Sequence, residues 1–433
     1  MDHSLLLLLA SLAAVAVAAV WHLRSHGRQT KLPLPPGPRG WPVLGNLPQL
    51  GAMPHHTMAA LARQHGPLFR LRFGSVKVVV AASAKVARSF LRAHDTNFSD
   101  RPPTSGAEHL AYNYQDLVFA PYGARWLALR KLCALHLFSA RALDALRTIR
   151  QDEARLMVTH LLSSSSPAGV AVNLEFKDMV VELMQLAGVL NIGDFVPALR
   201  WLDPQGVVAK MKRLHRRYDR MMDGFISERG QHAGEMEGND LLSVMLATIR
   251  WQSPADAGEE DGIKFTEIDI KALLLNLFTA GTDTTSSTVE SALAELIRDP
   301  CILKQLQHEL DGVVGNDRLV MEADLPRLTF LAAVIKETFR LHPATPLSLP
   351  RVAAEDCEVD GYHVSKGTTL IMNVWAIARD PASWGPDPLE FRPVRFLPGG
   401  LHESADVKGG DYELIPFGRV GGYAQASAGA FGW

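Results

Sequence analysis

Residues 271–298 read KALLLNLFTAGTDTTSSTVESALAELIR, and this stretch decides the fold. Apolar side chains recur along it at helical spacing, and no proline interrupts them, which predicts a helix. Thr266 and Asp269, three residues apart, form a variant of the capping box that begins a helix, and Asp299-Pro300 ends one. We therefore expect one long helix between residues 266 and 299.

The middle of this helix carries Ala280-Gly281-Thr282-Asp283-Thr284. Glycine costs about 1 kcal/mol relative to alanine inside a helix, and Asp and Thr side chains compete for backbone hydrogen bonds. The motif therefore suggests a local opening, where a hydroxyl and a carboxylate could bind dioxygen or water and pass protons to a buried centre. The alternative is a Thr/Ser-rich helix whose hydroxyls bond only to its own carbonyls.

Two further pairs of residues share a helix face. Glu337 and Arg340 are three apart and can pair, with a surface salt bridge as the plainer interpretation. Arg395 could join them if the fold brings it close. Trp126 and Arg130 are four apart and could hold a carboxylate ligand, although ordinary packing beside a solvated arginine is the alternative.

The rest of the chain predicts a mainly α protein with small β-sheets. Helical periodicity dominates residues 84–250, and a second long helix is expected to end before Pro343. The acidic stretch 253–262 is typical of a surface loop. That second helix covers residues 328–341. Strands are expected at residues 68–73, 76–81, 358–364 and 368–373.

The N-terminus predicts a membrane anchor. The sequence is apolar and uncharged from Ser4 to Trp21, close to the about 20 residues with which a helix spans a bilayer. Basic residues follow this run, which places the body in the cytosol. A cleaved signal peptide is the alternative, but no Lys or Arg precedes the run. Residues 32–42 are rich in proline and predict a stiff, extended hinge.

Composition excludes some classes of function. Net charge is −2, from 44 basic and 46 acidic residues, so a nucleic-acid-binding surface is not expected. The cysteines Cys133, Cys301 and Cys357 are far apart and form no CxxC pair, so neither a disulfide framework nor a zinc site is expected.

Taken together, these motifs resemble the cytochrome P-450 family in type, order and spacing. The resemblance implies the cytochrome P-450 fold, haem b as cofactor, and electrons from NADPH through NADPH–cytochrome P-450 reductase. It also implies single-pass anchoring in the endoplasmic reticulum membrane. The implied organisation is an anchor at 1–31, a hinge at 32–42, an incomplete catalytic domain at 43–417 and an aberrant Gly/Ala-rich tail at 418–433.

The resemblance also implies a role for each candidate residue. Asp283 and Thr284 match the acid–alcohol pair that delivers protons to bound dioxygen, and Gly281 matches the point where the helix opens over haem. Contacts to the haem propionates are implied for Trp126, Arg130 and Arg351. A structural charged triad is implied for Glu337, Arg340 and Arg395.

Within the family, three stretches are similar to plant flavonoid 3'-hydroxylases, namely RPPTSGAEHLAYNYQDLVFAPYGARW (residues 101–126), NIGDFVPALRWLDPQG (residues 191–206) and HPATPLSLPR (residues 342–351). Tyr114 favours these enzymes over the related 3',5'-hydroxylases. The likeness implies hydroxylation of the flavonoid B ring. A monooxygenase acting on another phenolic compound is the alternative.

The resemblance fails after Phe417. The family binds iron through a cysteine thiolate in an F-x-x-G-x-R-x-C-x-G loop. Ala424 occupies the cysteine position, and no cysteine follows Cys357. Tyr423 is one position off and is rejected as a substitute ligand. We therefore expect no metal site, an absent ligand loop and following helix, and no activity in this sequence. A non-catalytic membrane protein without haem is a further alternative.

A one-base deletion explains the tail. Codons compatible with residues 417–433 can be chosen so that one guanine added at codon 418 gives FGAGRRVCAGLSWGLRM. This product restores the Phe, Gly, Arg, Cys and Gly of the ligand loop. We expect the transcript to contain such a frame.

Overall fold

The computed structural model describes residues 32–163, 174–231, 241–251, 264–407 and 409–417. The predicted anchor, the acidic loop and the tail therefore lie outside the described residues. Within the described part of the chain, none of the helices has both the length and the apolar character needed to cross a bilayer.

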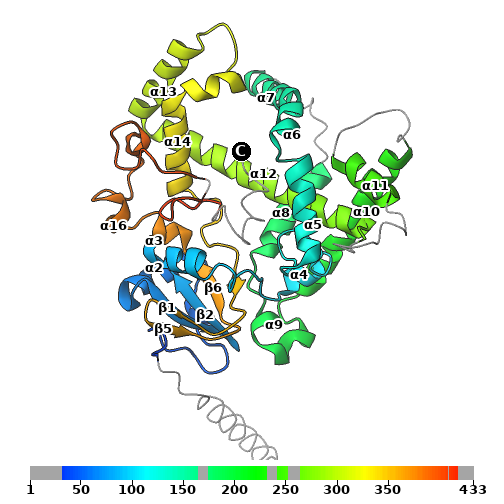
Figure 1. The fold of residues 1–433 in the computed structure, drawn as a ribbon, viewed down its shortest axis with the longest axis vertical. Coiled ribbons are helices and arrows are strands. Elements are labelled where there is room, and N and C mark those ends of the chain that lie inside the picture. The colour runs from blue at the N-terminus through cyan, green and yellow to red at the C-terminus, as the bar shows by residue number, and fades with distance from the viewer. Residues whose placement is uncertain (1–31, 164–173, 232–240, 252–263, 408, 418–433) are drawn as a thin grey trace, which may run out of the picture.

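Helices make up most of the described chain, as expected (Figure 1). Short helical segments are η1 (Leu47–Gln49), η2 (Ser89–Ala93), η3 (Pro197–Leu202), η5 (Glu322–Arg327) and η6 (Pro393–Phe396). The α-helices are α2 (Pro54–His65), α3 (Ala84–Arg88), α4 (Ser105–His109), α5 (Ala124–His136), α6 (Ala140–Ala145), α7 (Arg147–Leu162), α8 (Leu174–Ala187), α9 (Ile192–Phe195), α10 (Val207–Gln231), α11 (Leu241–Trp251), α12 (Glu267–Arg298), α13 (Pro300–Val313), α14 (Thr329–Leu341), α15 (Val374–Ile377) and α16 (Pro381–Trp384).

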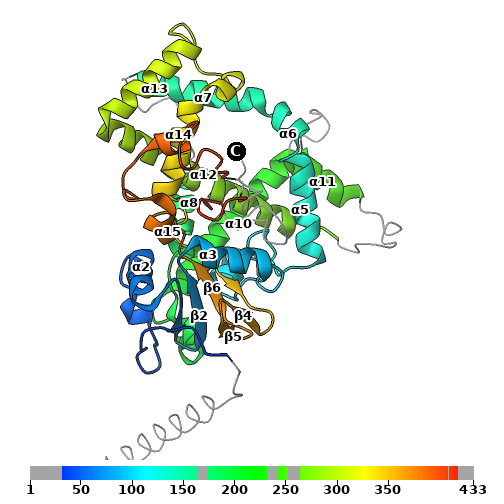
Figure 2. The same cartoon turned by 60° about the vertical axis from the view of Figure 1, so that its left-hand side comes forward.

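Two small sheets confirm the predicted strands. The larger sheet has the order β1-β2-β6-β3, formed by β1 (Leu68–Phe73), β2 (Val76–Ala81), β6 (Thr369–Met372) and β3 (Arg351–Val352). The smaller sheet is the hairpin of β4 (Cys357–Val359) and β5 (Tyr362–Val364). β6 runs parallel to β2 and all four of its residues are buried, as expected of a strand covered on both faces. Figure 2 shows both sheets at the end of the molecule away from α13.

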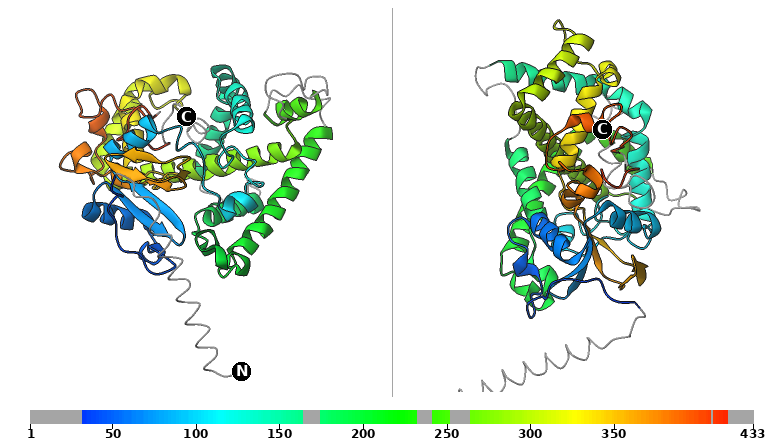
Figure 3. Two further views of the ribbon diagram at one scale, coloured as in Figure 1. Left: turned by 60° about the horizontal axis from the view of Figure 1, so that its bottom comes forward. Right: turned by 90° about the vertical axis from the view of Figure 1, so that its left-hand side faces the viewer.

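The long helix α12 crosses the middle of the fold. Thr266 and Asp269 form the predicted capping box, and Asp299 ends the helix and also caps α13. Figure 3 shows α12 running between α10 and α11 on one side and α13 and α14 on the other. Its first half is buried in the largest hydrophobic core, through Ile270, Leu273 and Leu275 among others. The polar motif at residues 280–284 follows this buried half, and its residues are part-buried except for the exposed Thr282.

The proline-rich hinge is extended, as predicted, and it docks on the sheets. The Pro36 carbonyl accepts a hydrogen bond from the Arg70 N–H at 2.7 Å, and the Pro33 carbonyl accepts one from His363 at 2.8 Å. Gly37 is required for this approach, because a Cβ there would lie 2.1 Å from the Arg70 carbonyl oxygen. Residues 32–42 therefore belong to the folded body.

Candidate functional site

Glu337 and Arg340 pair at the centre of a buried polar network. Both side chains have no exposed surface, and the guanidinium donates two hydrogen bonds of 2.7 Å to the carboxylate. Arg340 also donates to the carbonyls of Ala378, Pro388 and Glu390. The pair is therefore no surface salt bridge, and the plainer interpretation of its spacing is wrong. The segment after α15 and α16 folds onto α14 to supply these acceptors.

Arg395 lies beside this pair, as the sequence suggested. Its Nε is 3.5 Å from Glu337 Oε1, and its terminal nitrogens donate to the carbonyls of Trp384 and Asp387. The Arg392 N–H donates to the same Glu337 oxygen at 2.7 Å. The Glu337 carboxylate thus accepts hydrogen bonds from Arg340 and a backbone amide and forms an ion pair with Arg395, which ties η6 to α14.

The motif at residues 280–284 does not open the helix, which corrects the expectation. α12 is one continuous helix from Glu267 to Arg298. The Thr284 hydroxyl donates to the Ala280 carbonyl, and the Thr288 hydroxyl donates to the Thr284 carbonyl at 2.8 Å. The back-bonding alternative therefore describes Thr284 and Thr288, whose hydroxyls find their acceptors one turn earlier. Gly281 faces open space, since a Cβ there would meet no atom within 4 Å.

Buried arginines gather beside the loop that joins α4 to α5. Arg351 is 4% exposed, its Nη1 lies 3.4 Å from Asp95, and its Nε has no hydrogen-bond partner in the described structure. Burial lowers the pKa of Arg351, and the nearby Asp95 opposes this shift. A buried guanidinium with an unused N–H can bind an anionic group of a ligand.

Arg101 belongs to the same group, and sequence reasoning did not single it out. It donates to the carbonyls of Val118, Leu349 and Pro350. Burial, together with the positive charge of Arg351, lowers the pKa of Arg101 to about 9. Two of these acceptors, Leu349 and Pro350, lie more than 200 residues away in sequence, so no local pattern could have revealed this placement.

Trp126 and Arg130 lie on α5, at the other side of this loop. The Trp126 indole N–H donates to the Leu117 carbonyl at 3.2 Å, and the Arg130 guanidinium stacks over the Trp126 ring at 5.3 Å. No carboxylate of the described residues forms an ion pair with Arg130, and burial lowers its pKa. Trp126 and Arg101 thus donate to adjacent carbonyls of one loop.

Asp116 and Asn276 fix this loop against α12. Asn276 donates to Asp116 at 2.8 Å and accepts hydrogen bonds from the Leu117 and Val118 amides. Asp116 has no exposed surface, and burial raises its pKa to about 6, although its hydrogen bonds oppose this shift. Asn276 lies one helical turn before Ala280. Its hydrogen bonds to residues 116–118 therefore connect the loop beside the arginines to the polar motif of α12.

The haem that the resemblance implies fits one end of this site and not the other. Arg351, Arg101 and Arg130 offer cations suited to carboxylates such as haem propionates. On the opposite side, Phe417 packs edge-on against Phe339 of α14 at 5.0 Å. The position of the iron ligand, Ala424, lies outside the described residues, and the sequence offers no thiolate there. In the described part of the chain, no group of three or more His, Cys, Asp or Glu residues could hold a metal ion.

Comparisons with known proteins agree with the fold and the motifs. The family model for cytochrome P450 matches residues 35–171 and 169–419. A flavonoid 3'-monooxygenase of Oryza sativa subsp. japonica is 65% identical over 455 residues, covering 95% of this chain and 85% of the relative. A flavonoid 3'-monooxygenase of Petunia hybrida is 55% identical over 429 residues, covering 92% of this chain and 82% of the relative.

A solved structure agrees as well. A zebra fish cytochrome P450, in a structure with progesterone, superposes with a TM-score of 0.67 at 25% identity. The match covers 87% of this chain and 89% of the other. With its central helix, its buried Glu–Arg network and these relatives, the chain belongs to the cytochrome P450 family of monooxygenases.

Proposed function

We propose that this chain is built as a flavonoid 3'-hydroxylase and that its sequence as given does not carry out the reaction. The observation that carries the substrate class is the 65% identity to a flavonoid 3'-monooxygenase. The observation that carries the inactivity is Ala424 at the position of the cysteine ligand. An alanine side chain has no atom that can bind iron.

The residues around the loop at 116–119 support the cofactor part of this proposal. Arg351, Arg101 and Arg130 would bind the haem propionates, with Trp126 orienting Arg130 by stacking. Haem, when bound through a thiolate, supplies the activation of dioxygen. No oxygenation step can be assigned to this sequence, because that thiolate is missing.

Asp283 and Thr284 would handle protons in a version with the ligand loop. Both side chains are partly buried on α12, next to the open space that faces Gly281. Rotation of the Thr284 hydroxyl away from the Ala280 carbonyl would let it donate to a water or ligand in that space. Residues 4–21 would hold the protein on the endoplasmic reticulum membrane, where NADPH–cytochrome P-450 reductase would supply electrons.

The test compares two proteins with naringenin as substrate. One is the chain as given, and the other replaces residues 418–433 by GAGRRVCAGLSWGLRM and continues in the frame that the transcript encodes. With reductase and NADPH, we expect a B-ring hydroxylated product only from the second protein. Product from the first protein would refute the inactivity, and turnover of a different phenolic compound alone by the second would refute the substrate class.

Absence of the thiolate also favours a second candidate function, a membrane protein that binds ligands without haem chemistry. Naringenin binding by the chain as given, at an affinity matching that of the restored protein, would support this candidate. Loss of naringenin binding in the chain as given would exclude it.

A further inference from the structure

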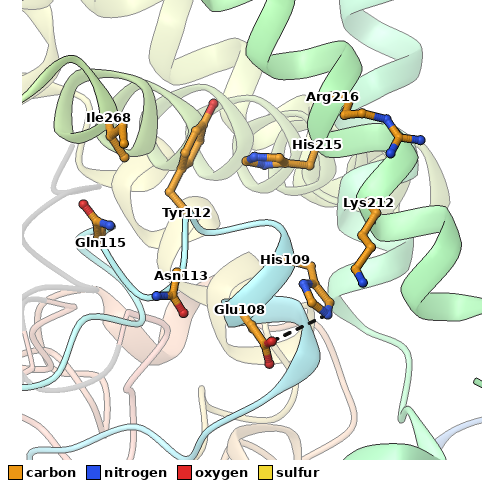
Figure 4. Close-up of a pocket in the computed structure, with 9 residues that line it drawn as sticks. All are labelled: Glu108, His109, Tyr112, Asn113, Gln115, Lys212, His215, Arg216 and Ile268. Carbon is orange, nitrogen blue, oxygen red and sulfur yellow. Dashed lines mark ion pairs between the residues drawn. The ribbon is translucent and has the colours of Figure 1, made fainter. Parts of the chain in front are cut away.

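A cavity of about 430 Å³ lies on the far side of the turn that precedes Asp116, and none of the candidate site residues described so far lines it. Its walls come from α4, the turn that follows α4, α10 and the first turn of α12 (Figure 4). Ile268 marks its edge on α12, and Gly281 lies 13 residues further along the helix. At 1.5 Å per residue this separation is about 20 Å, so the cavity is distinct from the polar motif.

One wall of the cavity carries two cations that form no ion pair with the described residues. Lys212 and Arg216 are one turn apart on α10, and both are exposed. Neither forms an ion pair with a carboxylate of the described residues, whereas Glu108, the acidic residue lining the cavity, pairs with Arg200. Like charges one helical turn apart repel each other, which an anionic ligand between them would relieve.

The floor of the cavity is aromatic. The rings of Tyr112 and His215 meet edge to face with their centroids 4.5 Å apart, and Figure 4 shows them side by side. Burial lowers the pKa of His215 and of His109, so both imidazoles are neutral near pH 7. The His215 Nδ1 is buried and has no hydrogen-bond partner in the described structure. The cavity therefore meets the face of the His215 ring and not its Nδ1.

The turn after α4 is held in a conformation that side chains rarely adopt. Tyr112, Asn113 and Tyr114 have φ of 49°, 55° and 62°, three consecutive residues in the left-handed region. Such residues cost on the order of 1–3 kcal/mol each and persist only when other contacts hold them. Here the Tyr112 hydroxyl bonds to Asp219 of α10 at 3.0 Å, and the Tyr114 hydroxyl bonds to the Thr104 carbonyl at 3.2 Å. These contacts fix the amide of Asn113 on the cavity wall.

From these features we propose that the cavity binds a hydroxylated aromatic carboxylate. The carboxylate lies between Lys212 and Arg216, and the ring packs on Tyr112, His215 and Ile268. The ring hydroxyl hydrogen-bonds to the side-chain amide of Asn113. This binding needs neither haem nor the ligand loop, so it is independent of the proposed function.

Equilibrium dialysis of the purified full chain with 4-hydroxycinnamate tests the proposal. Lys212→Gln with Arg216→Gln should weaken binding by about tenfold or more, because two charge-assisted hydrogen bonds are lost. The matched control is Lys210→Gln with Arg213→Gln, which removes the same charge from exposed positions of α10 that do not line the cavity. The control should bind as the unsubstituted chain does. Equal losses in both double variants, or equal binding of the uncharged methyl ester, would overturn the proposal.

Photolabelling gives a second measurement that does not depend on how the variants fold. With 4-azidocinnamate and the unsubstituted full chain, mass spectrometry should find the label on residues 108–115 or 212–216. Excess 4-hydroxycinnamate should suppress this labelling. Label confined to other segments, or labelling that the competitor leaves unchanged, would show that the cavity is not the binding site.

Discussion

Burial decides what a charged residue does in this protein, and spacing alone does not reveal burial. Glu337 and Arg340 are three residues apart on α14, and Asp152 and Arg155 are three apart on α7. Both pairs form, but the first has no exposed surface, whereas both side chains of the second are more than half exposed. The sequence therefore predicts the pairing of Glu337 with Arg340 and does not predict its environment.

This contrast leads to a prediction for Glu337→Ala. The substitution leaves the Arg340 guanidinium buried without its carboxylate, so the free energy of unfolding should fall by about 3–5 kcal/mol. Asp152→Ala is the matched control and should change stability by no more than about 1 kcal/mol, because its pair is exposed. Denaturant titration of both variants measures the effect, and equal losses would contradict the structural role of the pair.

Asp116 should make stability depend on pH. Burial raises its pKa to about 6, whereas an unfolded aspartate titrates near pH 4. The folded chain therefore binds more protons between these values, and this residue lowers the free energy of unfolding as the pH rises from about 4 to about 6. The loss amounts to about 3 kcal/mol and stays constant at higher pH.

Asp116→Asn removes this contribution. The fall in unfolding free energy between about pH 4 and pH 7 should be smaller in the variant than in the unsubstituted chain, by about 3 kcal/mol. Asp152→Asn, at an exposed position, should leave the pH dependence as it is. If Asp116→Asn also left it unchanged, the carboxyl of Asp116 would titrate normally in the folded protein.

At the scale of elements, α12 shows what sequence reasoning captured and what it missed. Its two ends follow from Thr266, Asp269 and Asp299, which act on their immediate neighbours. Its continuity through Gly281 does not follow from propensity, because a penalty of about 1 kcal/mol is small beside the packing of the buried first half of the helix. The Thr284 hydroxyl also bonds to the Ala280 carbonyl, and the helix needs no opening to accommodate it.

Thr284→Ala separates the structural and functional roles of this residue. In the chain as given, stability should stay the same or rise by about 0.5 kcal/mol, because alanine favours the helix. In the version with the ligand loop restored, the same change should divert NADPH oxidation from hydroxylated product to hydrogen peroxide, because a proton donor is lost. Product per NADPH and unfolding free energy are the two measurements. Unchanged coupling would mean that Thr284 is only a helix residue.

At the scale of the whole molecule, the order of motifs was enough to predict the fold. Within the described residues, the helices and strands that the sequence indicated lie where expected, and the family comparisons confirm the architecture. The arginine group was only partly predictable. Arg351 and Arg130 were expected from the resemblance, but Arg101 joins them through acceptors at Leu349 and Pro350, which only the folded chain brings near.

The anchor is a whole-molecule prediction as well. Deleting residues 1–31 should release the protein from membranes, because no other run of the sequence is both long enough to span a bilayer and apolar throughout. The uncharged run at residues 156–174 is interrupted by four serines and a proline. Alkaline carbonate extraction of cells expressing either form measures this, with the full chain as the control that stays in the pellet. A truncated protein that still pelleted would refute a single N-terminal anchor.

The carbon monoxide difference spectrum of the purified, reduced full chain tests the central claim most directly. The claim is that this cytochrome P450 chain carries Ala424 at the position of the cysteine that ligates iron. The version carrying GAGRRVCAGLSWGLRM and its continuing frame should show the absorption band of the thiolate-ligated haem complex, and the chain as given should show none. A thiolate-type band from the chain as given would contradict the account.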